Sequence, residues 1–239
     1  MAEGEQMSVN SEFKPYYQDG LTTIYHGDCR EILPMLALEP DLVVTDPPYG
    51  VKERTERGKA GRGRSKYALG PARNFAPVHG DDEAYDPTPI LGFKRLITFG
   101  ANHYADKMPP SPSWIVWDKL DGLRSKRGFG FNDNGDAEMA WSNLGGPVRI
   151  VSHRWMGLIR DSEKERHVHP TQKPVYLFSV LIGHYTEGGH LVLDPYMGSG
   201  PVLVAAKALG RRAIGIEIEE KYCEVTANRL AQETLWGAA

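Results

Sequence analysis

Cysteine is scarce in this chain of 239 residues, which contains only Cys29 and Cys223. The two residues are far apart and lack the spacing of metal ligands, so we expect reduced thiols, no metal site and a cytoplasmic location. Long apolar runs are lacking too, since none approaches the roughly 20 residues of a membrane-spanning helix. These absences exclude a disulfide scaffold and a helical membrane span.

Net charge is also small, with 28 Lys and Arg against 31 Asp and Glu and a formal charge of −3. Overall charge therefore does not predict nucleic-acid binding, which has to rest on local clusters. One cluster, residues 52–74, combines glycines with eight basic and two acidic residues. We expect a basic loop over 52–80 that contacts phosphate, and the alternative is an ordinary solvated loop.

Domain organisation follows from length and composition. The length suits one α/β domain with insertions. Residues 1–15 are mostly polar and are predicted to be a disordered tail, and 16–239 are predicted to be a single domain. Apolar patterns predict strands at 21–26, 42–45, 95–100, 113–118, 136–141, 149–155, 190–194 and 213–217, and helices at 30–38, 175–185, 201–209 and 220–233.

The stretch Leu42–Gly50 is the main candidate for a functional site. Its apolar start predicts a buried strand, and Asp46, Pro47, Pro48 and Tyr49 follow where open α/β sheets bind ligands. The prolines have no N–H donors, whereas their carbonyls and the Asp46 carboxylate are acceptors. Acceptors beside a flat aromatic ring suit a planar group that bears an NH2, such as a nucleobase. The alternative is a plain strand-ending turn.

A second constellation lies near the C-terminus. The predicted strand 190–194 leads into the turn 195–200, with Gly198 and Gly200, then a helix and a strand that ends at Glu217. This order is typical of nucleotide binding, because glycines allow a close backbone approach and an acid can accept from ribose hydroxyls. The pattern does not choose NAD over other adenosine cofactors.

Five motifs in register resemble the permuted (β-group) DNA amino-methyltransferases, which use S-adenosylmethionine. They are residues 27–29, 45–50, 169–174, 194–200 and 215–217. The resemblance implies a Rossmann-like, doubly wound α/β sheet, circularly permuted, with a small target-recognition insertion within about 119–168. Two positions depart from the family pattern: Tyr196 replaces the commoner Phe, and Pro201 replaces a Thr whose hydroxyl would lie near the cofactor.

The resemblance also implies roles for particular residues. On the catalytic side, Asp46 and the Pro47 carbonyl would accept from the target amine, beside Pro48, and Tyr49 would stack on the flipped base. On the cofactor side, the implied residues are Asp28 for the adenine, Glu217 for the ribose, Thr171 and Lys173 for the carboxylate, and Asp194, Tyr196, Met197, Gly198, Ser199 and Gly200 around the methionine. A helix N-cap is the alternative for Asp28, and a surface lysine is the alternative for Lys173.

The function implied is site-specific methylation of double-stranded DNA by S-adenosylmethionine, in the cytoplasm of a bacterial cell or a phage-infected host. In this family Asp at the position of Asp46 favours adenine N6, whereas Ser is commoner for cytosine N4. Cytosine N4, a glutamine or RNA substrate, and an inactive DNA-binding module are the alternatives. A homodimer is left open, and the recognition sequence is not predicted.

Overall fold

The structure, a computed structural model, describes residues 14–50, 79–121, 135–156, 159–163 and 172–233. The basic segment 52–74 and Thr171 therefore lie outside the described residues, as do most of the predicted tail and parts of 119–168. No helix in the described ranges is long and apolar enough to cross a membrane.

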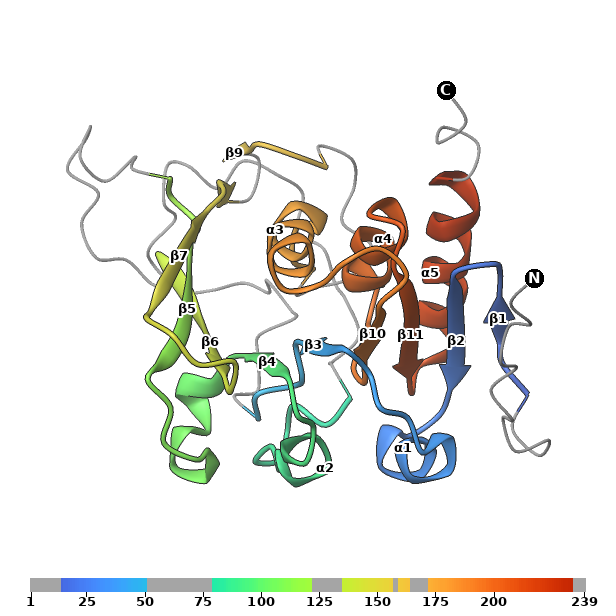
Figure 1. Ribbon diagram of the computed structural model, residues 1–239, viewed down its shortest axis with the longest axis horizontal. Coiled ribbons are helices and arrows are strands. Elements are labelled where there is room, and N and C mark those ends of the chain that lie inside the picture. Colours follow the sequence, from blue (N-terminus) through green and yellow to red (C-terminus); the bar gives the residue numbers. More distant parts are fainter. Residues whose placement is uncertain (1–13, 51–78, 122–134, 157–158, 164–171, 234–239) are drawn as a thin grey trace, which may run out of the picture.

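One large mixed sheet dominates the described part of the chain (Figure 1). In spatial order its strands are β1 (Tyr17–Gln18), β2 (Thr22–His26), β11 (Arg212–Glu217), β10 (Leu191–Asp194), β3 (Leu42–Thr45), β4 (Leu96–Phe99), β6 (Ala137–Ser142), β5 (Ser113–Asp118) and β7 (Arg149–Ser152). Strands β2, β11, β10, β3 and β4 are parallel, whereas β6 runs antiparallel to both of its neighbours. A separate hairpin pairs β8 (Trp155–Met156) with β9 (Ile159–Arg160).

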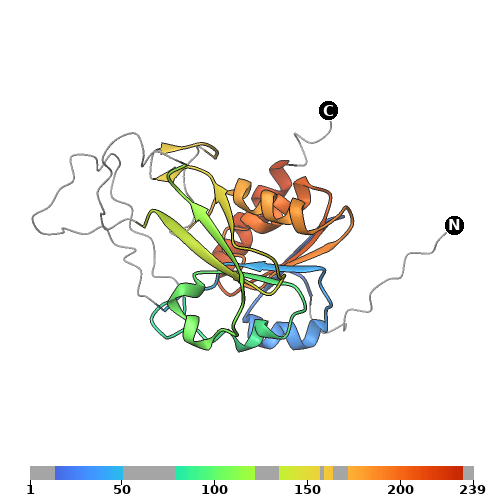
Figure 2. The same cartoon turned by 60° about the vertical axis from the view of Figure 1, so that its left-hand side comes forward.

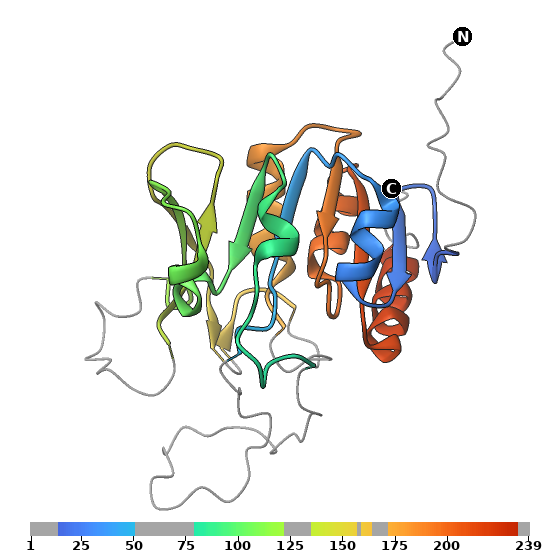
Figure 3. The same cartoon turned by 90° about the horizontal axis from the view of Figure 1, so that it is seen from below.

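Helices cover both faces of this sheet, as expected for a doubly wound fold. Helices α3 (Val175–Tyr185), α4 (Pro201–Ala208) and α5 (Glu220–Glu233) lie on one face, and α1 (Cys29–Leu36) and α2 (Thr88–Leu91) lie on the other (Figure 2). Figure 3, seen from below, shows α1 and α2 in front of the strands. Two short 3-10 turns, η1 (Ala101–His103) and η2 (Ala105–Lys107), follow β4.

The core is split by the sheet into two apolar layers, one under α3 and α4 and the other under α1 and α2. All four residues of each of the central strands β3, β10 and β4 are buried. Strands covered on both faces read as continuous apolar runs, which is why they were recognisable in the sequence. The predicted helices and strands in the described ranges are present, with ends shifted by at most three residues.

The parallel strands bring their carboxyl ends to one edge of the sheet. Asp28 follows β2, Glu217 ends β11, Asp194 ends β10, Asp46 follows β3 and Gly100 follows β4. The chain passes from β10 to β11 through α4 on one face, and from β3 to β4 through α2 on the other. The boundary between β10 and β3 is therefore the switch point at which such sheets bind ligands.

Candidate active site

The ends of β3 and β10 are joined by a buried hydrogen bond. Thr45 Oγ1 donates to Asp194 Oδ1 at 2.7 Å, and the backbone N–H of Tyr196 donates to the same oxygen at 3.2 Å. Burial raises the pKa of Asp194 to about 7, although both donors oppose this shift. The bond holds the predicted catalytic strand against the predicted cofactor strand.

Beyond β3, Asp46 belongs to a closed ring of three polar groups. Tyr49 OH donates to Asp46 Oδ1 at 2.5 Å, Lys173 Nζ donates to Tyr49 OH at 2.9 Å, and Lys173 also forms an ion pair with Asp46 Oδ2. The Lys173 side chain is only 5% exposed. Both carboxylate oxygens of Asp46 thus have partners in this structure.

The ionisation states of these three polar groups follow from burial and from neighbouring charges. Burial raises the pKa of Asp46, and Lys173 opposes that shift. Burial alone would lower the pKa of Lys173, but the carboxylates of Asp46 and Glu138 raise it overall, so Lys173 remains an ammonium. Burial and the charge of Asp46 raise the pKa of Tyr49 well above its usual value, so its hydroxyl stays protonated and donates.

Glu138, on β6, joins this ring and was not predicted from the sequence. Its Oε2 lies 3.1 Å from Lys173 Nζ, and its Oε1 accepts from Lys119 Nζ at 3.0 Å. Burial would raise the pKa of Glu138, but Lys173 and Lys119 lower it to about 2. The only hint in the sequence is an acidic residue inside the predicted strand 136–141, which also begins with an acid, Asp136.

The ring of Tyr49 packs against the loop after β4. Its ring is stacked on that of His103, with centroids 5.2 Å apart and planes 14° apart. Gly100 lies directly against it, since a Cβ at Gly100 would be 1.9 Å from Tyr49 Cε1. Neither Gly100 nor His103 was predicted, because both belong to a separate strand end.

The glycine turn after β10 is held from β11 and α5. Gly198 and Gly200 have φ of 50° and 72°, in the left-handed region that favours glycine. The Gly198 N–H donates to Glu217 Oε2 at 2.9 Å, and Arg229 Nη1 donates to the Ser199 carbonyl at 2.6 Å. Burial raises the pKa of Glu217, against the effect of the N–H groups of Glu219 and Gly198.

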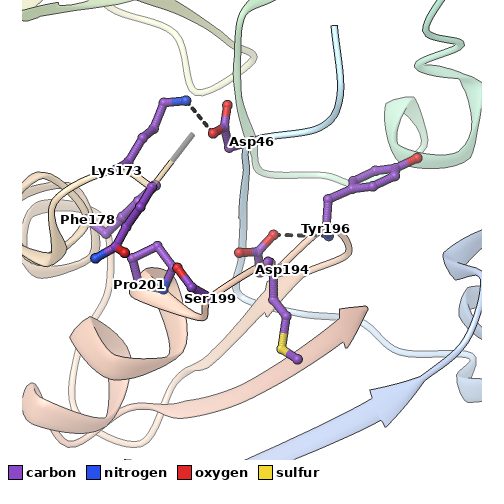
Figure 4. A pocket seen from close by; sticks show the side chains of 10 residues that line it. Asp46, Lys173, Phe178, Asp194, Tyr196, Ser199 and Pro201 are labelled. Atoms are coloured by element: carbon purple, nitrogen blue, oxygen red, sulfur yellow. Dashed lines mark hydrogen bonds and ion pairs between the residues drawn. The ribbon is translucent and has the colours of Figure 1, made fainter. Parts of the chain in front are cut away.

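One pocket includes parts of both constellations (Figure 4). Its lining residues come from the ends of β3 and β10, from the glycine turn and from the start of α3: Asp46, Gln172, Lys173, Phe178, Asp194, Tyr196, Met197, Gly198, Ser199 and Pro201. In Figure 4 the Lys173 side chain extends towards Asp46, whereas the Tyr196 ring points away from both. The tertiary structure thus unites two motifs that are about 150 residues apart in the chain.

Asp28 has a structural role in the described fold. It is the N-cap of α1, where its Oδ1 accepts from the Arg30 N–H at 2.8 Å, and it also pairs with the Arg30 guanidinium. The hydrogen bonds from Arg30 lower the pKa of Asp28, so it is ionised. This is the alternative that the sequence allowed, and its contact with a cofactor adenine stays a prediction. Among the described residues no acid, histidine and cysteine group is arranged to hold a metal ion.

Comparison with known proteins gives this site a context. A family model of N6/N4 DNA methylases matches residues 145–229. The type II methyltransferase M2.DpnII of Streptococcus pneumoniae is 46% identical, over 92% of this chain and 93% of that protein. This chain belongs to the N6/N4 DNA methylases. It is also 43% identical to the type II methyltransferase M.HinfI of Haemophilus influenzae, over 92% of this chain and 71% of that protein.

Solved structures of other methylases share the fold of this DNA methylase. The M1.HpyAVI–SAM complex superposes with a TM-score of 0.54 at 21% identity, covering 88% of this chain and 99% of that one. The cytosine-N4-specific PvuII DNA methyltransferase gives a TM-score of 0.59 at 15% identity, covering 91% and 89%. The expected Rossmann-like methyltransferase fold is therefore confirmed.

Replacing Asp194 by Asn tests whether its carboxyl is buried in a site that favours the neutral form. The folded wild type binds this proton more tightly than the unfolded chain, so Asp194 reduces stability progressively as the pH rises from about 4 to 7. Asp194→Asn keeps an amide oxygen for both donors and removes the titration. Urea unfolding at pH 5 and pH 7.5 measures the free energy of unfolding of both proteins. Relative to the wild type, the variant should be more stable at pH 7.5 than at pH 5. The difference should grow by about 1.4 kcal/mol for each pH unit between pH 5 and the folded-state pKa of Asp194. A constant difference would contradict this assignment.

A second variant, Gly100→Ala, tests the packing of the Tyr49 ring. The new methyl group would overlap that ring and would require an unfavourable φ of 70°. Gly145→Ala is a matched control, because Gly145 has a φ of 73° and no atom of the described residues, its chain neighbours apart, lies within 4 Å of the position that its Cβ would take. Chemical denaturation should show Gly100→Ala losing about 1–3 kcal/mol more stability than the control. Equal losses would mean that Tyr49 moves aside freely.

Proposed function

We propose that this DNA methylase transfers the methyl group of S-adenosylmethionine to the N6 amine of adenine in double-stranded DNA. The main support is the shared pocket, in which Asp46 and Lys173 lie beside the turn that carries Gly198 and Ser199. An acceptor site for an amine and a glycine turn for a nucleoside cofactor are the two parts that amine methylation needs. Family membership supports an exocyclic amine as the target.

The described residues suit this cofactor. The positive φ of Gly198 and Gly200 suits residues without a side chain, and Pro201 starts α4 without an N–H of its own. At Gly200 the missing side chain makes room for Thr226 of α5. Glu217, held by the N–H groups of Gly198 and Glu219, is the candidate for the ribose hydroxyls. Bound S-adenosylmethionine would supply an electrophilic methyl group on a sulfonium. A cofactor-bound M1.HpyAVI structure of the same fold adds support.

On the target side, we assign Asp46 to the amine of the flipped base. That amine is a poor nucleophile because its lone pair is delocalised into the ring. A fixed carboxylate that accepts from an N–H bond favours the tetrahedral nitrogen on which positive charge develops. The Pro47 carbonyl is the second acceptor, Pro48 restricts the turn, and Tyr49 provides the stacking face. Asp46 need not be a strong base, because the methylated ammonium is far more acidic.

The order of the strands supports a circular permutation. Strands β10 and β11, last in sequence, stand between β2 and β3, which are early in sequence. The first described strand, β1, and the last described helix, α5, both pack against β2 (Figure 1). A chain that continued from α5 into β1 and opened elsewhere would retain every strand pair, which is why such a change is tolerated.

The catalytic role of Asp46 is tested by Asp46→Ala. We expect methyl transfer to fall by about 10²–10³, because one preorganised charged acceptor is lost. Cofactor affinity should change little, since Asp46 is not part of the glycine turn. Single-turnover transfer from tritiated S-adenosylmethionine to DNA measures the rate, and calorimetry measures affinity. The exposed Asp106→Ala is a control. Near-wild-type rates in Asp46→Ala would refute the assignment.

The methylated base is identified by a separate experiment. DNA methylated by the wild-type protein is digested to nucleosides, which are separated and identified by mass spectrometry. We expect N6-methyladenine, because Asp rather than Ser stands at position 46. N4-methylcytosine would overturn the choice of base but leave amine methylation intact. Cofactor binding without a methylated base would favour an inactive DNA-binding module.

A further inference from the structure

The Asp46 carboxylate is engaged before any target arrives. Tyr49 OH donates to one of its oxygens, and the Lys173 ammonium pairs with the other. In the proposed reaction the target amine needs an acceptor in this position. A bound amine must therefore displace Lys173 from Asp46 or share the carboxylate with it.

Positive charge on the target makes this displacement important for the rate. As the methyl group transfers, the target nitrogen becomes cationic, and an ammonium that remains on Asp46 would compete for the same carboxylate and repel that charge. Lys173 cannot simply move into water, because its side chain is 5% exposed and its Nζ lies 5.4 Å and 5.3 Å from the ring centroids of Tyr49 and Phe99. It needs another anionic partner within reach.

Glu138 is that partner. Its Oε2 is 3.1 Å from Lys173 Nζ, is shielded from solvent and receives no hydrogen bond of good geometry from the described residues. This oxygen can therefore still accept a hydrogen bond from the Lys173 ammonium. The other oxygen, Oε1, is fixed by Lys119 at 3.0 Å. The strand β6 runs antiparallel and enters the sheet at the edge where the parallel strands end, which is how Glu138 reaches the site.

The charges of the four groups balance. Asp46 and Glu138 are carboxylates, and Lys119 and Lys173 are ammonium groups, so their formal charges cancel. Without Glu138 the cluster would hold an excess positive charge in a largely buried site, and Asp46 would be the sole carboxylate paired with Lys173 among the described residues. Lys173 would then bind Asp46 more tightly.

We propose that Glu138 is a positioning residue for methyl transfer, which acts by holding the Lys173 ammonium and drawing it off Asp46 when the target amine binds. This inference rests on the proposed function. Glu138 itself does not line the shared pocket. In the resting site Lys173 keeps Asp46 ionised and oriented, and in the reacting site it remains paired with Glu138.

The test is Glu138→Gln, which preserves shape and removes the charge. We expect kcat to fall about 10- to 100-fold, with little change in KM for DNA or in cofactor affinity, because the loss arises after both have bound. Glu39→Gln is the matched control, since Glu39 forms a solvent-exposed ion pair with Lys94 and should retain wild-type kcat. A wild-type kcat in Glu138→Gln would overturn the proposal.

A double-mutant cycle with Lys173→Met shows whether Glu138 acts through Lys173. In the Lys173→Met background, Glu138→Gln should cost no further rate in single-turnover assays, and the two changes should also be non-additive in urea unfolding. Additive losses in rate would mean that Glu138 has only a structural role and would overturn the proposal. If Glu138→Gln does not fold, Glu138→Gln with Lys119→Met restores charge balance and replaces it in the cycle.

The activity of the wild-type protein in the same assays distinguishes a failure of this inference from a failure of the proposed function on which it rests. A wild-type protein that methylates no base in DNA would refute the proposed function, and the positioning role with it. A wild-type protein that methylates DNA, together with an unaffected Glu138→Gln, would refute only the positioning role.

Discussion

The buried ammonium of Lys173 is the interaction on which this site depends. It binds Asp46 from the end of β3, Tyr49 from the turn after β3, and Glu138 from β6, and its own residue lies just before α3. A buried charge is stable only with well-placed partners, so these elements must meet in one arrangement. The same contacts hold Asp46, the acceptor of the proposed reaction, in a fixed orientation before a substrate binds.

The parallel sheet makes this meeting possible. Five parallel strands end at one edge, and the neighbouring strands β3 and β10 are connected by the bond from Thr45 to Asp194. The turn that carries the proposed catalytic residues and the glycine turn are thereby placed side by side at the switch point. Because the strands are hydrogen-bonded across the sheet, their relative positions do not depend on the order in which the chain supplies them. A permuted chain order is compatible with the same site for this reason.

Much of the fold was predictable because its strands are covered on both faces. Runs such as Leu42–Thr45 and Leu191–Asp194 are almost wholly apolar, and Pro and Gly mark where they end. Asp46, Gly198 and Glu217 were recognisable for a related reason: short motifs follow directly after such runs. Glu138 and His103 were not, since each is a single residue in an unremarkable local context. Their importance comes from contacts with Lys173 and Tyr49, which are distant in sequence.

The sequence by itself determined the α/β class, the strand ends at which the candidate site lies, and the resemblance to DNA amino-methyltransferases. Local patterns suffice for these features, because apolar periodicity, turn residues and motif spacing act over a few neighbouring positions. Only the tertiary structure decided that Asp28 caps a helix and that Lys173 pairs with Asp46 and Glu138. Those partners are selected by the packing of strands and helices, and the ionisation of a buried group depends on which charges surround it in space rather than in sequence.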